Sequence, residues 1–121
     1  MAVEILPGNM RPAQPMVSIC IPNYNGAEYI EQCIRSVLVQ ERDYEIEIIL
    51  HDDASTDESL QIIRAQFPQV EVLANKENVG FCISNNRMVA QASGQFILLL
   101  NNDAALAPDA LEVLYEESKT Q

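Results

Sequence analysis

Continuous apolar runs alternate with helically spaced apolar positions along this chain. The runs predict buried strands at residues 16–21, 45–51, 70–73 and 96–100. Apolar residues at helical spacing predict helices at 27–40, after the Ser55–Glu58 capping box and up to Pro68, at 81–92, and from Pro108 onward. The alternating order predicts an α/β fold, a parallel sheet with right-handed crossovers and helices on both faces.

The first 15 residues show no such pattern. They contain Pro7, Gly8, Pro12 and Pro15, which predicts a disordered leader before a domain over residues 16–121. Within that domain, Asn25 is the predicted cap of the first helix.

Polar clusters follow three of the predicted strands, at residues 22–25, 52–53 and 101–103. The carboxyl ends of parallel strands meet at one edge of the sheet, where ligands bind in open α/β folds. These clusters predict a nucleotide site, because together they offer an aromatic ring, a carboxylate that can accept a hydrogen bond from an imide or a ribose, and a carboxylate that can hold a metal. The alternative for the Asn101–Asn102–Asp103 cluster is an ordinary turn, because Asn and Asp satisfy backbone groups in loops.

The net charge of the chain restricts the classes of ligand that it can bind. The net charge is −11 and only 7 of 121 residues are Lys or Arg, which argues against nucleic acid as a partner. Neither a G-x-G-x-x-G nor a Walker-type phosphate loop occurs. A phosphorylated ligand would therefore need a divalent cation, and oxygen ligands favour Mg²⁺ or Mn²⁺.

Cysteine usage and hydropathy bear on the compartment. The three cysteines are odd in number and form no C-x-x-C pair, so we interpret them as buried apolar residues. No apolar run is long enough to span a bilayer. We expect a cytoplasmic protein, at the cytoplasmic face of the membrane in its full-length form.

Four motifs in order carry a resemblance to a known family. They lie at residues 17–26 (VSICIPNYNG), 49–57 (ILHDDASTD), 78–81 (NVGF, with Asn85 and Asn86) and 99–103 (LLNND). From residue 16 onward the chain resembles the nucleotide-sugar-binding half of family 2 glycosyltransferases with the GT-A fold, a Rossmann-like parallel α/β sheet. The wording of the last two motifs is most similar to the rhamnosyltransferase-type branch.

The resemblance implies roles by position. Tyr24 would stack on the base, Asp53 would accept a hydrogen bond from it, and Asp103 would bind the metal as the last residue of a D-x-D element. Asn101 replaces the first acid of that element, so metal binding would also need the donor's phosphates. The other donor-site residues implied by the motifs are Pro22, Asn25, Glu28, Gly80, Asn86 and Asn102.

The resemblance also implies an inverting transfer from a nucleoside-diphosphate sugar to a glycan or lipid-linked acceptor, in cell-surface polysaccharide synthesis. The catalytic base and acceptor half would lie beyond Gln121, so we expect little activity from this chain alone and self-association through the surface left uncovered. A non-catalytic nucleotide-sugar-binding module is the main alternative. A phospho-acceptor signalling domain is a weaker one, because neither Lys76 nor Lys119 lies at the end of an apolar strand.

Overall fold

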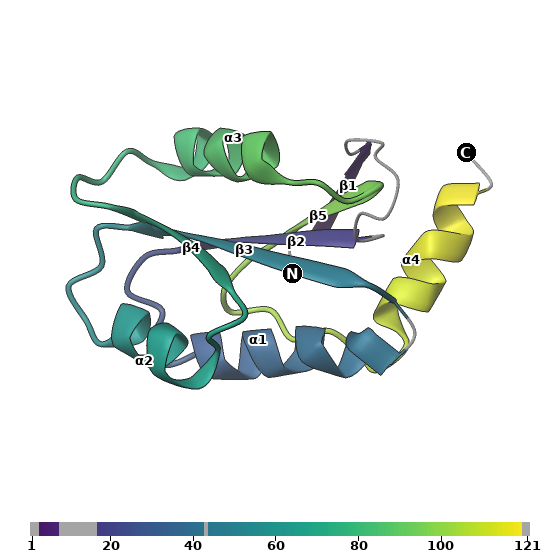
Figure 1. Cartoon of the computed structure of the whole chain (residues 1–121), viewed down its shortest axis with the longest axis horizontal. Coiled ribbons are helices and arrows are strands. Elements are labelled where there is room, and N and C mark those ends of the chain that lie inside the picture. The colour runs from purple at the N-terminus through teal and green to yellow at the C-terminus, as the bar shows by residue number, and fades with distance from the viewer. Residues whose placement is uncertain (1–2, 8–16, 43, 120–121) are drawn as a thin grey trace.

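The computed structural model describes residues 3–7, 17–42 and 44–119, which form a single five-stranded sheet with flanking helices (Figure 1). The strands are β1 (Val3–Pro7), β2 (Val17–Asn23), β3 (Ile46–Asp53), β4 (Glu71–Asn75) and β5 (Phe96–Leu100). The helices are α1 (Ile30–Leu38), the 3₁₀ helix η1 (Val39–Arg42), α2 (Ser59–Gln66), α3 (Phe81–Gln91) and α4 (Ala110–Lys119). The sheet order is β1-β5-β2-β3-β4.

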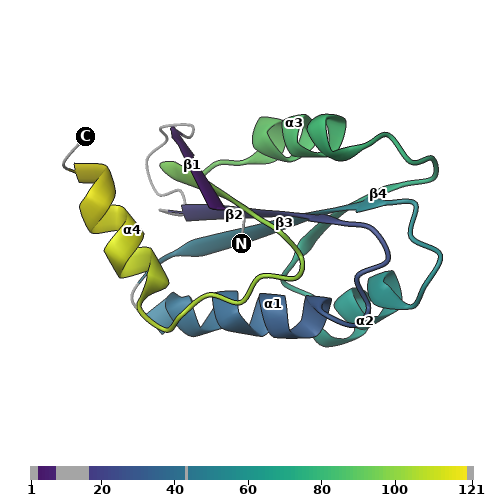
Figure 2. The same ribbon diagram turned by 180° about the vertical axis from the view of Figure 1, so that it is seen from behind.

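The four strands from β2 to β5 run parallel, which confirms the predicted α/β sheet. Helices α1 and α2 cover one face and α3 covers the other, as Figure 2 shows from behind. Each face has its own buried apolar cluster, since alternate residues of a strand point to opposite faces. Ile48 and Leu50 of β3 join the cluster beneath α1, whereas Ile49 joins the one beneath α3.

Strand β5 pairs with β2 on one side and with β1 on the other. The β1–β5 pairing is antiparallel, with Val3 opposite Leu100 and Pro7 opposite Phe96. This differs from our expectation of a disordered leader over residues 1–15, which is wrong for Val3–Pro7. An open sheet edge offers unpaired backbone groups to any extended segment that reaches it. The pairing depends on a partner about 90 residues away, so local periodicity gave no sign of it. Residues 1–2 and 8–16 lie outside the described ranges.

Strand β3 is longer at its end than predicted. It continues through Asp52 and Asp53, which pair with Asn23 of β2 and with Ala74 and Asn75 of β4. Both acids are therefore buried strand residues and do not belong to a following loop.

Both predicted side-chain caps are wrong. Asn25 adopts a positive φ of 51°, and the first amides of α1, those of Tyr29 and Ile30, bond instead to the carbonyl of Gly26. At α2, the amide of Ser59 donates to Asp57 Oδ1 over 3.0 Å, and Ser55 turns back to Asp52.

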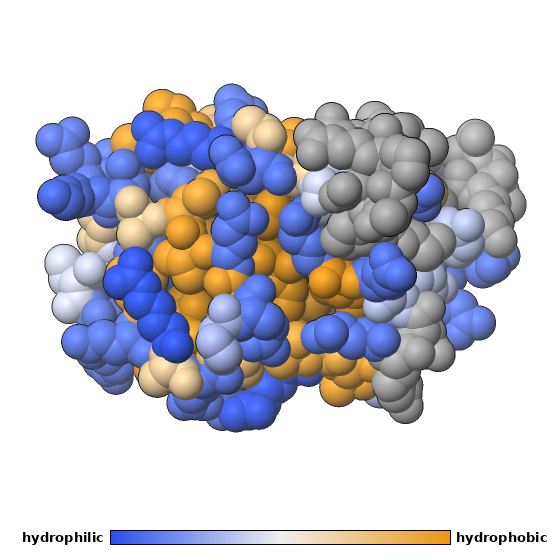
Figure 3. Space-filling view, in the orientation of Figure 1, coloured by the Kyte–Doolittle hydropathy of each residue, from blue (hydrophilic) through white to orange (hydrophobic). Residues whose placement is uncertain are grey.

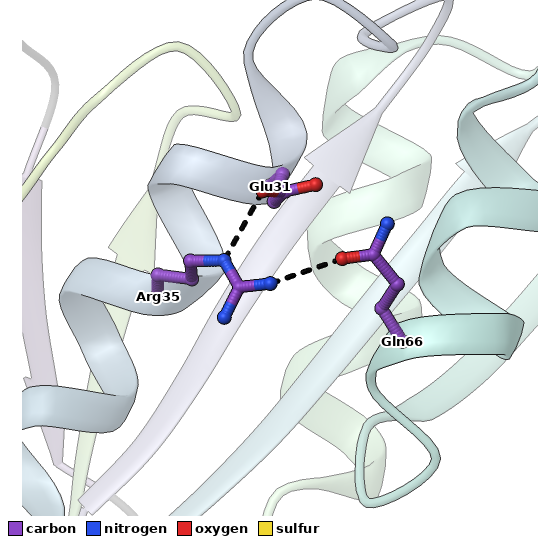
Figure 4. A network of polar contacts seen from close by, with 3 residues as sticks. All are labelled: Glu31, Arg35 and Gln66. Atoms are coloured by element: carbon purple, nitrogen blue, oxygen red, sulfur yellow. Dashed lines mark hydrogen bonds and ion pairs between the residues drawn. The ribbon is translucent and has the colours of Figure 1, made fainter.

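Helices α1 and α2 are joined at their surface by Arg35 (Figure 4). Its guanidinium bonds Glu31 at 3.2 Å and Gln66 at 3.0 Å, and it lies 5.3 Å from the ring centre of Phe67. Arg35 and Glu31 are exposed and both belong to α1, so their ion pair adds little to stability, whereas the bond from Arg35 to Gln66 links the two helices.

One edge of the sheet is formed by β4, whose Val72 and Leu73 are half-buried. Figure 3 shows apolar side chains gathered in the middle of the face that carries this edge. Across the described ranges, none of the helices combines the length and apolar character that a bilayer span requires.

Candidate functional site

A cleft of about 300 Å³ opens beyond the carboxyl ends of β2, β3 and β5, beside the first turn of α3. Its lining comes from all three predicted polar clusters and from the α3 segment: Pro22, Asn23, Tyr24, Asp53, Asn78, Gly80, Phe81, Ser84, Asn101 and Asn102. The strand-end argument therefore placed the cleft correctly.

Six of the ten candidate ligand residues line this cleft: Pro22, Tyr24, Asp53, Gly80, Asn101 and Asn102. The other four, Asn25, Glu28, Asn86 and Asp103, are exposed residues outside its lining. Asp103 directly follows the lining residue Asn102, and we call residues 101–103 the rim of the cleft, although Asp103 itself is not in the lining.

Asp53 organises one wall of the cleft. Its two carboxylate oxygens accept hydrogen bonds from the backbone amides of Val79 at 2.7 Å and Gly80 at 2.9 Å. Gly80 has a φ of +88°, which a residue with a side chain adopts only under strain. Asp53 thus ties the end of β3 to the start of α3, and it keeps unused lone pairs for a ligand.

Two aromatic rings are open to solvent in the lining. Tyr24 is 54% exposed and Phe81 is 57% exposed, although both belong to residue types that are normally well covered. A planar ligand in the cleft would cover apolar ring surface here. The sequence argument selected Tyr24 and overlooked Phe81, which it treated only as the first residue of a helix.

Ser84 was also overlooked. It is 1% exposed, lines the cleft, and its Oγ has no hydrogen-bond partner among the described residues. The neighbouring apolar residue Ile83 is 46% exposed, and the buried residues of α3 are Ser84 and Met88. A buried hydroxyl without a partner is costly, which makes it a candidate for contact with a bound polar group.

A second polar network lies behind the cleft. Asn23 donates from Nδ2 to Asp52 Oδ1 and to Ser59 Oγ, both at 2.9 Å, and its Oδ1 accepts from Asn102 Nδ2 at 2.9 Å. Asp52 also accepts from the hydroxyl of Ser55 at 2.7 Å. Asp52 is therefore a structural residue and does not line the cleft.

Asn25 and Asp57 join the two loops that follow β2 and β3. Asn25 Oδ1 accepts from the amide of Thr56 at 2.8 Å, and Asp57 Oδ2 accepts from the amide of Ala27 at 3.0 Å. Partial burial opposes ionisation of Asp57, but hydrogen bonds from Ser59 and Ala27 outweigh it and lower its pKa. In this structure Asn25 acts on the loops and not on the cleft.

The rim offers hard oxygen donors to a cation. Asp103 supplies one exposed carboxylate, and the neighbouring Asn101 and Asn102 carry amide oxygens. Among the described residues there is no cluster of three or more His, Cys, Asp or Glu side chains able to hold a metal. This donor set fits a partly hydrated Mg²⁺ or Mn²⁺ that takes its remaining ligands from phosphate oxygens.

A small apolar hollow lies elsewhere, between α4 and the sheet, with Phe96, Leu111 and Tyr115 in its lining. It has room for about 20 Å³ and exposes almost no polar atoms. It is a gap in the packing of α4 and has no groups for chemistry.

Comparison with known proteins adds an independent line of evidence. The family model described as glycosyl transferase family 2 matches residues 18–120. The chain is 38% identical to a chondroitin synthase of Pasteurella multocida (strain Pm70) over 106 residues, covering 85% of this chain and 11% of that protein.

Solved structures agree with the fold. The crystal structure of S. aureus TarS 1-349 in complex with UDP superposes with a TM-score of 0.76 at 27% identity, covering 87% of this chain and 32% of the TarS 1-349 chain. The mannosyltransferase PcManGT of Pyrobaculum calidifontis, in complex with GDP-Man and Mn²⁺, gives a TM-score of 0.72 at 25% identity, covering 92% of this chain and 34% of that one. The predicted GT-A fold is confirmed. The chain spans about a third of each of these two structures and 11% of the chondroitin synthase.

Proposed function

The chain belongs to glycosyl transferase family 2, and from this premise we propose that it is the donor-binding portion of an inverting glycosyltransferase. The enzyme transfers a sugar from a nucleoside diphosphate to an acceptor hydroxyl. The observation that carries the proposal is the cleft itself, because one hollow gathers an exposed aromatic ring, a buried carboxylate and two amides at the strand ends.

The nucleoside would occupy the part of the cleft between Tyr24 and Asp53. Tyr24 offers its exposed ring to the flat face of the base, and the Asp53 oxygens accept from an imide N–H or a ribose hydroxyl. Phe81 adds a second exposed aromatic ring to the lining of the cleft. Ser84 supplies a hydroxyl that a polar atom of the nucleoside would satisfy.

The diphosphate would point toward the rim formed by Asn101, Asn102 and Asp103. The domain brings no phosphate loop, and its net charge of −11 opposes an anionic ligand. A divalent cation held by Asp103 and by the phosphates themselves removes that conflict. When bound, Mg²⁺ or Mn²⁺ would supply Lewis-acid stabilisation of the charge that develops on the leaving diphosphate.

The residues of this chain bind and orient the donor, and Asp53 also fixes the loop that shapes the cleft. We place the catalytic base and the acceptor-binding surface in the part of the full-length protein outside residues 1–121. The acceptor would be a glycan or a lipid-linked sugar, and the pathway would be polysaccharide synthesis at the cytoplasmic face of the membrane. The support for a rhamnosyltransferase-type branch is the wording of residues 78–81 and 99–103.

Calorimetric titration tests the proposal. The purified chain is titrated with UDP and with dTDP, with and without Mn²⁺, and the titrations are repeated on Asp103→Asn and on Asp109→Asn. Asp109 is an exposed acid that directly precedes α4 and is not in the lining of the cleft, so it serves as the matched control. We expect Mn²⁺ to tighten binding in the wild type and in Asp109→Asn, and not in Asp103→Asn. No binding of either nucleotide under any condition would contradict the proposed site.

A further inference from the structure

We propose that Asn102 is a positioning residue for Asp103. We also propose that the hydrogen bond to Asn23 requires an asparagine at position 102 and excludes an aspartate like the neighbouring Asp103. This inference rests on the proposed role of Asp103 at the donor site. It assigns to Asn102 a role beyond lining the cleft. The argument starts from the orientation of one buried amide.

Asn23 is 1% exposed, and its two amide ends face different partners. Its Nδ2 lies 2.9 Å from Asp52 Oδ1 and 2.9 Å from Ser59 Oγ. The carboxylate of Asp52 can only accept. The hydroxyl of Ser59 donates its hydrogen to Asp57 Oδ1 at 2.6 Å, so the Ser59 oxygen can only accept from Asn23. The NH₂ group of Asn23 is therefore fixed on this side.

With the NH₂ end fixed, the carbonyl end of Asn23 must face Asn102. Asn23 Oδ1 accepts there from Asn102 Nδ2 at 2.9 Å. Position 102 must consequently offer a hydrogen-bond donor. An aspartate of the same shape would place one acceptor against another in a half-buried site, and both would lose their bond.

Gly26 leaves the space that this pair needs. A Cβ at position 26 would lie 2.2 Å from Asn102 Nδ2 and 2.3 Å from Asn23 Oδ1. The absence of a side chain at Gly26 therefore allows the two amides to meet. Two segments that are distant in sequence, the end of β2 with its following loop and the turn after β5, converge on this one hydrogen bond.

The bond matters because of the turn that carries Asp103. The amide of Ala104 donates to the carbonyl of Asn101 at 3.1 Å, which makes Asn102 and Asp103 the two central residues of a tight turn. Anchoring the Asn102 side chain to Asn23 fixes this turn against the sheet. The turn thereby restrains the backbone of Asp103, whose side chain is exposed to solvent.

The first arm of the test measures stability and needs no ligand. Asn102→Asp, Asn102→Ala and Asn101→Asp are unfolded in urea. Asn101→Asp is the matched control, because the described bonds of Asn101 come from its backbone carbonyl. We expect Asn102→Asp to raise the unfolding equilibrium constant about tenfold or more, Asn102→Ala to raise it less, and Asn101→Asp to change it little. An Asn102→Asp variant as stable as Asn101→Asp, or more stable than Asn102→Ala, would overturn the proposal.

The second arm measures positioning. For Asn102→Ala, which adds no charge, the dissociation constant of UDP is compared with and without Mn²⁺. We expect the Mn²⁺-dependent tightening to shrink several-fold while metal-free binding changes much less. Equal loss of both would mean that Asn102 supports the fold only, and would overturn the positioning role. Absence of UDP binding in the wild type would instead contradict the proposed function, and the stability arm would still report on the amide pair.

Discussion

Replacing Asp53 with Asn tests how much of the cleft depends on one side chain. The carboxylate is 6% exposed and accepts from the amides of Val79 and Gly80. In Asp53→Asn one oxygen remains as an acceptor, while the new NH₂ group faces a backbone N–H that also donates. Hydrogen bonds to charged groups contribute about 1.5–3 kcal/mol each, so losing one and weakening the other should cost about 2–4 kcal/mol.

That loss is smaller than the stability of a typical domain, so the variant should remain folded. The assay combines urea unfolding with amide hydrogen exchange, because local opening of the loop exposes the amides of Val79 and Gly80 before global unfolding does. Asp103→Asn, at an exposed acid, serves as the control and should change stability by less than about 0.5 kcal/mol. Unchanged exchange at Val79 and Gly80 together with unchanged stability would refute the reasoning.

Three further predictions follow from buried polar and sulfur groups. Ser84→Ala removes a hydroxyl that has no partner among the described residues, so urea unfolding should show equal or slightly greater stability and calorimetry should show weaker UDP binding. A clear loss of stability would mean that the hydroxyl is hydrogen-bonded in the free protein and would contradict the prediction. Burial lowers the pKa of His51, so the unfolded state takes up a proton first and the free energy of unfolding should fall as the pH drops below about 6.5. Unfolding curves at pH 5 and 7 should show this fall in the wild type and a smaller one in His51→Gln, and equal falls in both proteins would contradict the prediction. Burial also raises the pKa of Cys20 and of Cys33 to about 12, the latter aided by the charge of Asp103, so a thiol reagent should modify only the exposed Cys82 in the native protein and all three cysteines in urea; reaction of two or more native thiols would contradict it.

The sequence predicted the parts of the fold that depend on local pattern. The apolar run at 96–100 is strand β5, because burial on both faces of a parallel sheet leaves a plain signal in the sequence, and Asn101 and Asn102 after it line the cleft. The strand β1 left no such signal, because its partner is β5 at the far end of the chain.

The errors within the site have the same cause. Asn25 and Ser55 have the composition of helix caps, yet each bonds to a segment brought near by the sheet: Asn25 to Thr56 and Asp57, and Ser55 to Asp52 and to the amide of Asn25. The apolar spacing of residues 81–92 also gave no sign that Ser84 faces inward. A weak apolar stripe does not fix the rotation of a helix, and only the packing against β2 and β3 does so.

One measurement tests the central claim most directly. A two-dimensional amide NMR spectrum of the purified chain is recorded during titration with UDP, and then with a trace of paramagnetic Mn²⁺. The account predicts UDP-induced shifts concentrated at Tyr24, Asp53, Gly80 and Ser84, followed by Mn²⁺ broadening centred on residues 101–103. Shifts that spread over the surface away from the cleft, or broadening centred elsewhere on this acidic chain, would contradict it.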